Sequence, residues 1–279
     1  MFHTKNFICL TLLLIVMHAC LSAQTYSKET VVIETTLGTI KVKLFEETPL
    51  HKENFLKLAQ QHYFDSLLFH RVIFEFMIQG GDPLSRYARP GDSLGHGDAG
   101  YLVPAEFNRR LVHKKGRLCA ARDNDDVNPT QASSASQFYI VMGKVRTAQE
   151  LIKTEEKINK RRYNSLAAKY NSSEEGKRMN AKHAALLKAN KNDSAQLVRS
   201  LMDSTLQREY QKTPPYKFTV EEVKLYTTQA GTPHLDGSYT VFGEVTQGIE
   251  VVDRIASVKT DSRDRPIDDI RMKIYILNQ

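Results

Sequence analysis

Residues 30–45 alternate between apolar and polar side chains in a way that predicts a β-hairpin. An apolar run at 31–33 is followed by a bend at Leu37 and Gly38, and from 40 to 44 apolar side chains alternate with lysines. Because successive side chains of a strand point to opposite faces, this alternation turns one apolar face toward a core.

A helix is predicted directly after the hairpin. Thr48 suits the N-cap and Pro49 suits the first helical position. Three apolar side chains then fall on one face of a helix from 49 to 60, namely Phe55, Leu58 and Ala59.

Strand and helix patterns continue in the rest of the chain. Residues 138–141 and 240–245 have the apolar character of strands, 248–258 has apolar positions at helical spacing, and 272–276 predicts a closing strand. With 279 residues, of which 41% are hydrophobic, the chain can bury a core.

Residues 144–233 have a different character. They are rich in Lys, Arg, Gln, Ala and Asn, and they contain 18 Lys and Arg against 10 Asp and Glu, a net charge of +8 where the whole chain has +7. The basic character of the chain therefore belongs to this segment. Thr219 and Glu222 form a capping box for a last short helix. Apolar side chains at every fourth position predict another helix: Val198, Met202, Leu206 and Tyr210.

The first 23 residues predict a secretory signal peptide. They begin with a positive charge at Lys5 and continue with an apolar run at 7–16. They end in the small residue Ala23, after which we expect cleavage. The apolar run is too short to span a membrane comfortably. We therefore expect an exported protein of the bacterial periplasm, and the second interpretation is a lipoprotein anchored to the envelope through Cys20.

The cysteines and histidines exclude some classes of site. Cleavage after Ala23 leaves Cys119 alone, so no internal disulfide is expected, and a buried, inert thiol is the favoured interpretation. The nine histidines form no cluster with metal-ligand spacing, and no nucleophile–base pair indicates hydrolysis. We expect neither a metal nor a cofactor.

Three separated motifs carry the strongest functional signal. The first is 69–82, where Arg71 stands within apolar strand sequence, and the second is Ser-Gln-Phe-Tyr-Ile at 136–140. The third joins Leu-Asp-Gly at 235–237 to Val-Phe-Gly at 241–243. In this order the motifs resemble the cyclophilin family of peptidyl-prolyl cis-trans isomerases.

This resemblance covers residues 28–143 and 234–279, and it leaves 144–233 as a basic helical insert. It implies an eight-stranded antiparallel β-barrel capped by two helices, so the fold class is mainly β with an inserted α-helical segment. In the family's barrel the insert would leave and re-enter one short loop apart. We therefore expect it within a surface connection.

The implied reaction is rotation about an X–Pro bond, which amide resonance opposes with a barrier of about 18–20 kcal/mol. The resemblance makes Arg71 the catalytic donor, and it places Gln79 beside it as a hydrogen-bonding partner of the substrate. A guanidinium stays charged, and its hydrogen bond to the prolyl nitrogen strengthens as the lone pair leaves conjugation. Taken alone, the local sequence also fits a strand-edge Arg in an ion pair.

The resemblance also implies a substrate groove. An apolar pocket would hold the proline ring, Gln137 would bind the substrate backbone, and His70 would have a structural role. The expected substrate-binding residues are Phe76, Met77, Gly95, Ala121, Arg122, Gln137, Tyr139, Leu235 and Tyr239.

Four departures from the family's pattern stand near this groove. Phe74 and Glu75 replace a Pro-Gly pair, so the turn there must be rebuilt. Arg122 replaces Asn, His234 replaces Trp, and Tyr239 replaces His. Because the expected catalytic residues are retained, activity should survive, whereas peptide preference and tight binding of cyclosporin-type inhibitors are put in doubt.

The expected partners are unfolded or proline-containing polypeptides. Two alternatives stay open: a peptide-binding or chaperone module of low activity, and a basic insert that binds acidic partners. Nucleic acid is not expected, because an exported protein seldom meets it and the insert has few tyrosines for base stacking. Solvated helices whose charges serve solubility explain the insert equally well. The oligomeric state stays open.

Overall fold

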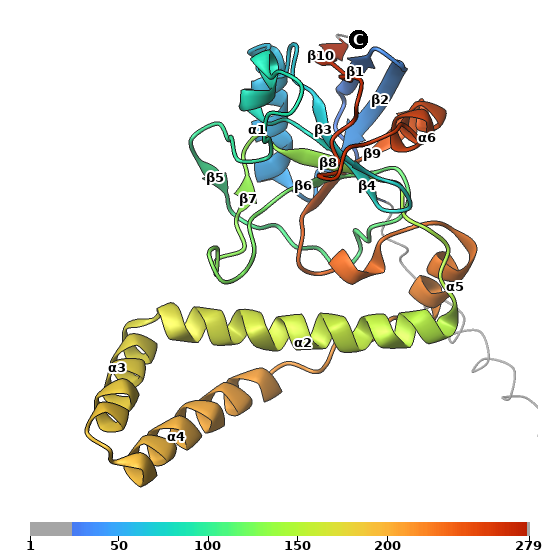
Figure 1. The fold of residues 1–279 in the computed structure, drawn as a ribbon. Coiled ribbons are helices and arrows are strands. Elements are labelled where there is room, and N and C mark those ends of the chain that lie inside the picture. The colour runs from blue at the N-terminus through green and yellow to red at the C-terminus, as the bar shows by residue number, and fades with distance from the viewer. Residues whose placement is uncertain (1–23, 278–279) are drawn as a thin grey trace, which may run out of the picture.

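A computed structural model describes residues 24–277, which form an antiparallel sheet of eight strands with helices around it (Figure 1). Neighbouring strands follow the order β10-β1-β2-β9-β6-β8-β4-β3. The strands are β1 (Thr30–Thr35), β2 (Gly38–Leu44), β3 (Phe69–Ile73), β4 (Met77–Gly80), β6 (Arg117–Ala120), β8 (Phe138–Val141), β9 (Val241–Gln247) and β10 (Met272–Leu277). A separate pair joins β5 (Leu102–Val103) to β7 (Ser133–Ser134).

The sheet curls until its two edges meet. Leu68, just before β3, pairs with Arg271, just before β10, and the Met272 amide donates to the Leu67 carbonyl at 2.8 Å. The expected eight-stranded antiparallel barrel is therefore confirmed.

The predicted N-terminal hairpin is present as β1 and β2. The two strands pair in a register that places Ile33 opposite Ile40 and Val31 opposite Val42. These four side chains are fully buried in the main core, which confirms the face predicted from the alternation.

The two expected capping helices are α1 (Pro49–Gln60) and α6 (Ile249–Ala256), and both contribute to the main core. The predicted cap of α1 is only half right. Thr48 occupies the N-cap position, but its side chain makes no capping hydrogen bond. Instead the Glu106 carboxylate accepts from the amides of Leu50 at 3.1 Å and His51 at 3.0 Å. An acid from a distant loop thus supplies the negative charge that a helix N-terminus favours.

The basic segment is helical as predicted. It consists of α2 (Ala148–Ser172), α3 (Glu174–Lys188), α4 (Asn192–Gln211) and α5 (Val220–Thr228). The capping box of Thr219 and Glu222 is present at the start of α5. Of the predicted stripe along α4, Val198, Met202 and Leu206 are buried and Tyr210 is half-buried.

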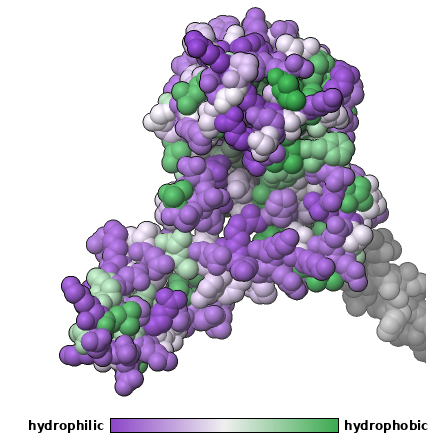
Figure 2. Space-filling view, in the orientation of Figure 1, coloured by the Kyte–Doolittle hydropathy of each residue, from purple (hydrophilic) through white to green (hydrophobic). Residues whose placement is uncertain are grey.

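The insert leaves and re-enters the barrel at adjacent points, as expected. Lys144 and Gly231 pair through both backbone amides, at 3.3 and 3.2 Å. Figure 1 shows α2 crossing below the barrel, with α3 and α4 turned away from it. Their outer surface is mainly hydrophilic (Figure 2).

Helices α2 and α5 are more than a surface arm. Tyr226 on α5 is fully buried, and Ile158 on α2 is 2% exposed. Helix α2 also lies against the short 3₁₀ helix η2 (Pro233–Leu235), which carries Leu235 of the predicted pocket. The sequence pattern did not predict this contact between insert and barrel.

The predicted signal peptide, with Cys20, lies outside the described residues. Between residues 24 and 277, none of the helices is long and apolar enough to cross a bilayer. Cys119 is buried on β6 as expected, and this burial raises the pKa of its thiol well above the ordinary value.

Candidate active site

Arg71 and Gln79 face each other on adjacent strands. Arg71 on β3 pairs in register with Gln79 on β4, and its Nη1 donates to Gln79 Oε1 at 3.4 Å. On its other side, Arg71 Nε lies 3.6 Å from Asp264 Oδ2. The Arg71 side chain remains 43% exposed. The guanidinium is therefore held from two sides and still accessible to a ligand.

A chain of side-chain amides continues from Arg71, which lines a pocket together with Gln79 and Gly95. Gln79 Nε2 donates to Gln137 Oε1 at 3.0 Å. Gln137 Nε2 in turn donates to the carbonyls of Gly95 at 3.1 Å and Gly97 at 2.7 Å. The structure thus brings together four residues that were predicted for the site, and it orders their polar groups along one wall.

Beside this polar wall lies an apolar cluster that contains the other predicted pocket residues. Met77, Tyr139 and Leu235 are at most 7% exposed, and partly buried side chains pack against them. Those partly buried members are Ile73, Phe76, Ala121 and Tyr239. Apolar surface with a few aligned polar groups is the usual composition of a ligand site.

The rebuilt turn between β3 and β4 uses a left-handed residue. Glu75 has φ +58°, and the Phe76 amide donates to the Ile73 carbonyl at 3.1 Å. Glycine normally occupies this position of such a turn, because a side chain there is strained. The Glu75 carboxylate lies 3.5 Å from Lys144 Nζ at the start of the insert.

Arg122, one of the predicted substrate-binding residues, has a side chain that is held by neighbouring residues. Its side chain is only 2% exposed, pairs with Asp125 at 2.7 Å and donates to the Ser238 carbonyl at 2.8 Å. The guanidinium also lies 4.5 Å from the centroid of the Tyr239 ring. Arg122 therefore supports Tyr239 rather than presenting a free charge to a peptide.

A buried polar network lies beneath the apolar cluster. Asp236 Oδ1 accepts from the backbone amide of His113 at 2.9 Å and from His113 Nδ1 at 2.8 Å, and its Oδ2 accepts from the Tyr226 hydroxyl at 2.7 Å. His113 Nε2 lies 3.1 Å from the Tyr139 hydroxyl. The pocket floor is thereby linked to helix α5 of the insert.

A second link joins helix α2 to the pocket. The Arg161 guanidinium donates to the carbonyl of His234, and the His234 ring packs against Phe76 with centroids 5.5 Å apart. The position of the absent tryptophan is thus filled by a smaller ring that α2 holds in place.

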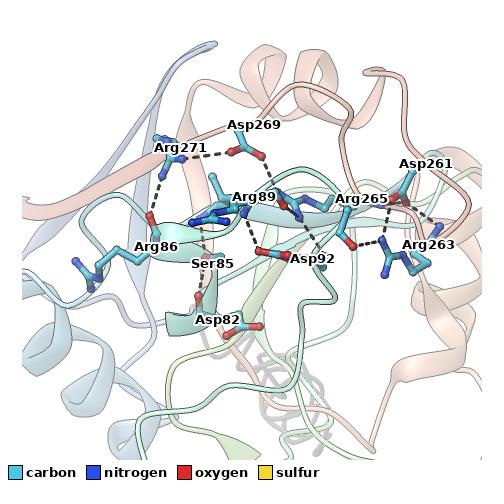
Figure 3. Close-up of polar contacts among 12 residues, drawn as sticks. Asp82, Ser85, Arg86, Arg89, Asp92, Asp261, Arg263, Arg265, Asp269 and Arg271 are labelled. Atoms are coloured by element: carbon cyan, nitrogen blue, oxygen red, sulfur yellow. Dashed lines mark hydrogen bonds and ion pairs between the residues drawn. The ribbon is translucent and has the colours of Figure 1, made fainter.

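An arginine–aspartate network joins two loops (Figure 3). Asp92 and Arg265 of these loops line the same pocket as Arg71. Arg265 is 6% exposed and donates to the carbonyls of Arg89 at 2.9 Å and Asp92 at 3.1 Å. It also pairs with Asp269 at 3.0 Å. The loop after the 3₁₀ helix η1 (Pro83–Tyr87) is therefore tied to the loop before β10.

Asp264 in this second loop was missed by the sequence analysis. Its φ is +63°, its carbonyl accepts from the Val72 amide at 2.8 Å, and its carboxylate faces Arg71. The sequence analysis also missed four supporting residues, namely Asp236, His113, Arg161 and Tyr226. Only Asp236 had a signal in the sequence, because it stands within the Leu-Asp-Gly motif.

Two histidines near the site are neutral at physiological pH. Burial lowers the pKa of His70 to about 4, and burial together with the Arg161 charge lowers the pKa of His234 to about 4. His70 is 4% exposed and faces Gly95, which fits the structural role expected for it. Within residues 24–277, no group of three or more His, Cys, Asp or Glu side chains could hold a metal ion.

We predict that the protein loses stability in mild acid, because His70 and His234 take up protons more readily in the unfolded chain than in the folded one. The unfolded chain protonates them near pH 6.5, whereas the folded chain does so only near pH 4. Their contribution is therefore complete above pH 6.5 and is lost as the pH falls toward 4. As the pH falls from 7 to 5, each of the two histidines should lower the unfolding free energy by about 2 kcal/mol.

Urea unfolding of wild type and of His234→Phe at pH 7 and pH 5 measures how much of the lost unfolding free energy comes from His234. Phe keeps a ring against Phe76 but cannot titrate, so the variant should lose about 2 kcal/mol less than wild type between pH 7 and 5. Equal losses in the two proteins would contradict the assigned pKa of His234.

Comparisons with known proteins identify a family and a fold that this chain shares. A sequence model of the family described as "Cyclophilin type peptidyl-prolyl cis-trans isomerase/CLD" matches residues 30–192 and 211–275. A solved structure from Cryptosporidium parvum, described as a cyclophilin type peptidyl-prolyl cis-trans isomerase, has a TM-score of 0.51 and 19% identity. It covers 91% of this chain and 99% of its own, which shows a common fold.

Curated relatives have similar descriptions. Peptidyl-prolyl cis-trans isomerase CYP18-2 of Arabidopsis thaliana is 25% identical over 244 residues, which cover 87% of this chain and 89% of the relative. Peptidyl-prolyl cis-trans isomerase-like 3 of Dictyostelium discoideum is 40% identical over 119 residues, which cover 42% of this chain and 67% of the relative.

Proposed function

The chain belongs to the cyclophilin family of peptidyl-prolyl cis-trans isomerases, and from this premise we propose that it rotates X–Pro bonds in exported polypeptides and so assists their folding. The observation that carries the proposal is the continuous polar wall from Arg71 through Gln79 to Gln137, which stands beside the apolar cluster. Rotation of a prolyl bond needs these two surfaces together.

The apolar cluster would hold the proline ring. Phe76 and Tyr239 stand at its partly exposed rim, and Met77, Tyr139 and Leu235 form its buried part. Binding the ring fixes one side of the amide, so that the rest of the peptide can turn against it. Gln79 and Gln137 would hydrogen-bond the peptide backbone on the other side.

Arg71 would then favour the twisted amide over the planar one. In the planar ground state the prolyl nitrogen shares its lone pair with the carbonyl and accepts poorly. At the twisted transition state the lone pair is localised, and a charged donor gains a stronger hydrogen bond. An interaction that strengthens only in the transition state raises the rate constant.

No proton transfer is required in this scheme. The histidine beside Arg71, His70, is buried and neutral because of its lowered pKa. Arg71 acts as a hydrogen-bond donor and transfers no proton. On a neutral peptide, we therefore expect a rate that does not follow histidine titration.

Export is supported by the pattern of the first 23 residues, a positive start followed by an apolar run and a small residue. A full-length fusion to a reporter enzyme that is active only outside the cytoplasm should be active in bacteria, and removal of residues 2–23 should abolish that activity. An equally active fusion without these residues would contradict export by this segment. Metabolic labelling with a radioactive fatty acid tests the lipoprotein alternative. A lipoprotein incorporates the label and loses it in the variant Cys20→Ala, whereas a protein that is cleaved after Ala23 is not labelled.

Assistance in folding is tested on a secreted protein whose slow refolding phase is limited by prolyl isomerisation. Uncatalysed exchange takes about tens to hundreds of seconds, so a catalyst should shorten this phase in proportion to its concentration. A slow phase that stays unchanged at stoichiometric enzyme would contradict the folding role.

A further inference from the structure

A groove runs between helix α2 and the loop that follows β6, and it opens beside the apolar cluster. Lys157, Lys160 and Arg161 of α2 form one wall, and Asp126 stands on the loop side. Tyr239 lines the same groove and belongs to the rim of the apolar cluster. A polypeptide held in the cluster can therefore continue into this groove.

Helix α2 is fixed against the site at this place. Arg161 donates to the carbonyl of His234, whose ring packs on Phe76. The charges of Arg161 and Lys157 both contribute to the lowered pKa of His234. Arg161 therefore lies against the pocket, and Lys157 and Lys160 line the groove that opens beside it.

The groove has an excess of positive charge. Asp125 on the loop side is already paired with Arg122 at 2.7 Å. Lys157 and Lys160 are exposed, and neither has an ion-pair partner between residues 24 and 277. Once the Arg122–Asp125 pair is set aside, three cations of α2 face the single carboxylate of Asp126, which leaves a net charge of +2.

We propose that this wall of α2 is an extension of the substrate site that binds acidic side chains, so that the enzyme prefers X–Pro bonds flanked by Asp or Glu. The inference rests on the proposed isomerase function. The insert then has a specific role, because one of its helices supplies a wall of the substrate site. The effect is local to the groove and differs from attraction by the whole basic insert.

The test compares two proline peptides that differ only in flanking residues, Glu in one and Gln in the other. At low salt the wild-type ratio of kcat/KM, Glu peptide over Gln peptide, should be about fivefold, as for two exposed ion pairs. The variant Lys157→Gln/Lys160→Gln should reduce this ratio to about one while the Gln peptide keeps its rate. Both lysines are exposed, so the variant should fold as the wild type does.

A matched control removes the same charge elsewhere. Lys182→Gln/Lys188→Gln changes two exposed lysines on α3 and should keep the wild-type ratio. The reversal Lys157→Glu/Lys160→Glu should favour a Lys-flanked peptide instead.

A wild-type ratio of one, or a ratio that survives in Lys157→Gln/Lys160→Gln, would overturn the proposal. A ratio that falls equally in the α3 control would also overturn it and would indicate long-range attraction, which weakens as salt shortens the screening length. In each of these cases the Gln peptide is still isomerised. A chain that accelerates neither peptide would instead contradict the proposed function, and this inference with it.

Discussion

Replacing Arg71 with Ala is expected to reduce kcat/KM on a proline peptide by about 10²–10³-fold, the usual effect of removing one preorganised donor. The barrel should remain folded, because the Arg71 side chain is 43% exposed and its two polar neighbours can turn to water. Protease-coupled or NMR measurements of cis-trans exchange give the rate, and urea unfolding gives the stability.

Arg71→Lys should also be poor, since an ammonium lacks the planar fork that can hold Gln79 and Asp264 while it donates to the substrate. Arg199→Ala on α4 serves as the control, because it removes an exposed arginine that is paired only within its own helix. If Arg71→Ala and Arg199→Ala have the same activity at equal stability, Arg71 is not the catalytic donor.

The largest effect on stability is expected for Asp236→Ala. Its carboxylate is 4% exposed and accepts from the His113 amide, from His113 Nδ1 and from the Tyr226 hydroxyl. Removing it leaves three buried donors unpaired, and the loss should be about 3–5 kcal/mol of unfolding free energy. Denaturant unfolding at pH 7 measures this loss.

Tyr226→Phe is the graded companion to that change. It removes a single hydrogen bond to a charged group and should cost about 1.5–3 kcal/mol, while the ring stays in the core. Because Tyr226 lies on the insert, this loss would show that α5 stabilises the barrel. Wild-type stability in both variants would contradict the role assigned to the buried network.

Local patterns were sufficient to predict the hairpin of β1 and β2, the strands β8, β9 and β10, and the helices α1, α4, α5 and α6, whereas no pattern indicated β6. The hairpin at 30–45, the strand at 138–141 and the stripe along α4 all follow from side chains whose burial is decided by their own element. The cap of α1 was predicted incorrectly in part, because Glu106 competes with Thr48 for the free amides from a loop 56 residues away. A local pattern contains no information on such a partner.

Most of the predicted site residues stand in three motifs, and the structure places them in a polar wall from Arg71 to Gln137 and in the apolar cluster beside it. The sequence did not indicate that Asp125 and Tyr239 would enclose the Arg122 side chain, because these contacts depend on the local fold. The supporting residues depend on contacts between distant segments, such as Arg161 with His234 and Tyr226 with Asp236. The short distance between the ends of the insert suggested an insertion into a surface connection. The long-range contacts of α2 and α5 with the pocket and the core could not be inferred from that distance.

The central claim is that this chain catalyses rotation about X–Pro bonds, and NMR exchange spectroscopy on a short proline peptide tests it most directly. The uncatalysed peptide exchanges over about tens to hundreds of seconds and shows no exchange cross-peaks between its cis and trans signals. With a catalytic amount of residues 24–279, we predict cross-peaks between the two isomers and an exchange rate that rises linearly with enzyme concentration. Peptide signals that shift on binding but show no exchange would contradict the claim, and they would identify the chain as a peptide-binding module without isomerase activity.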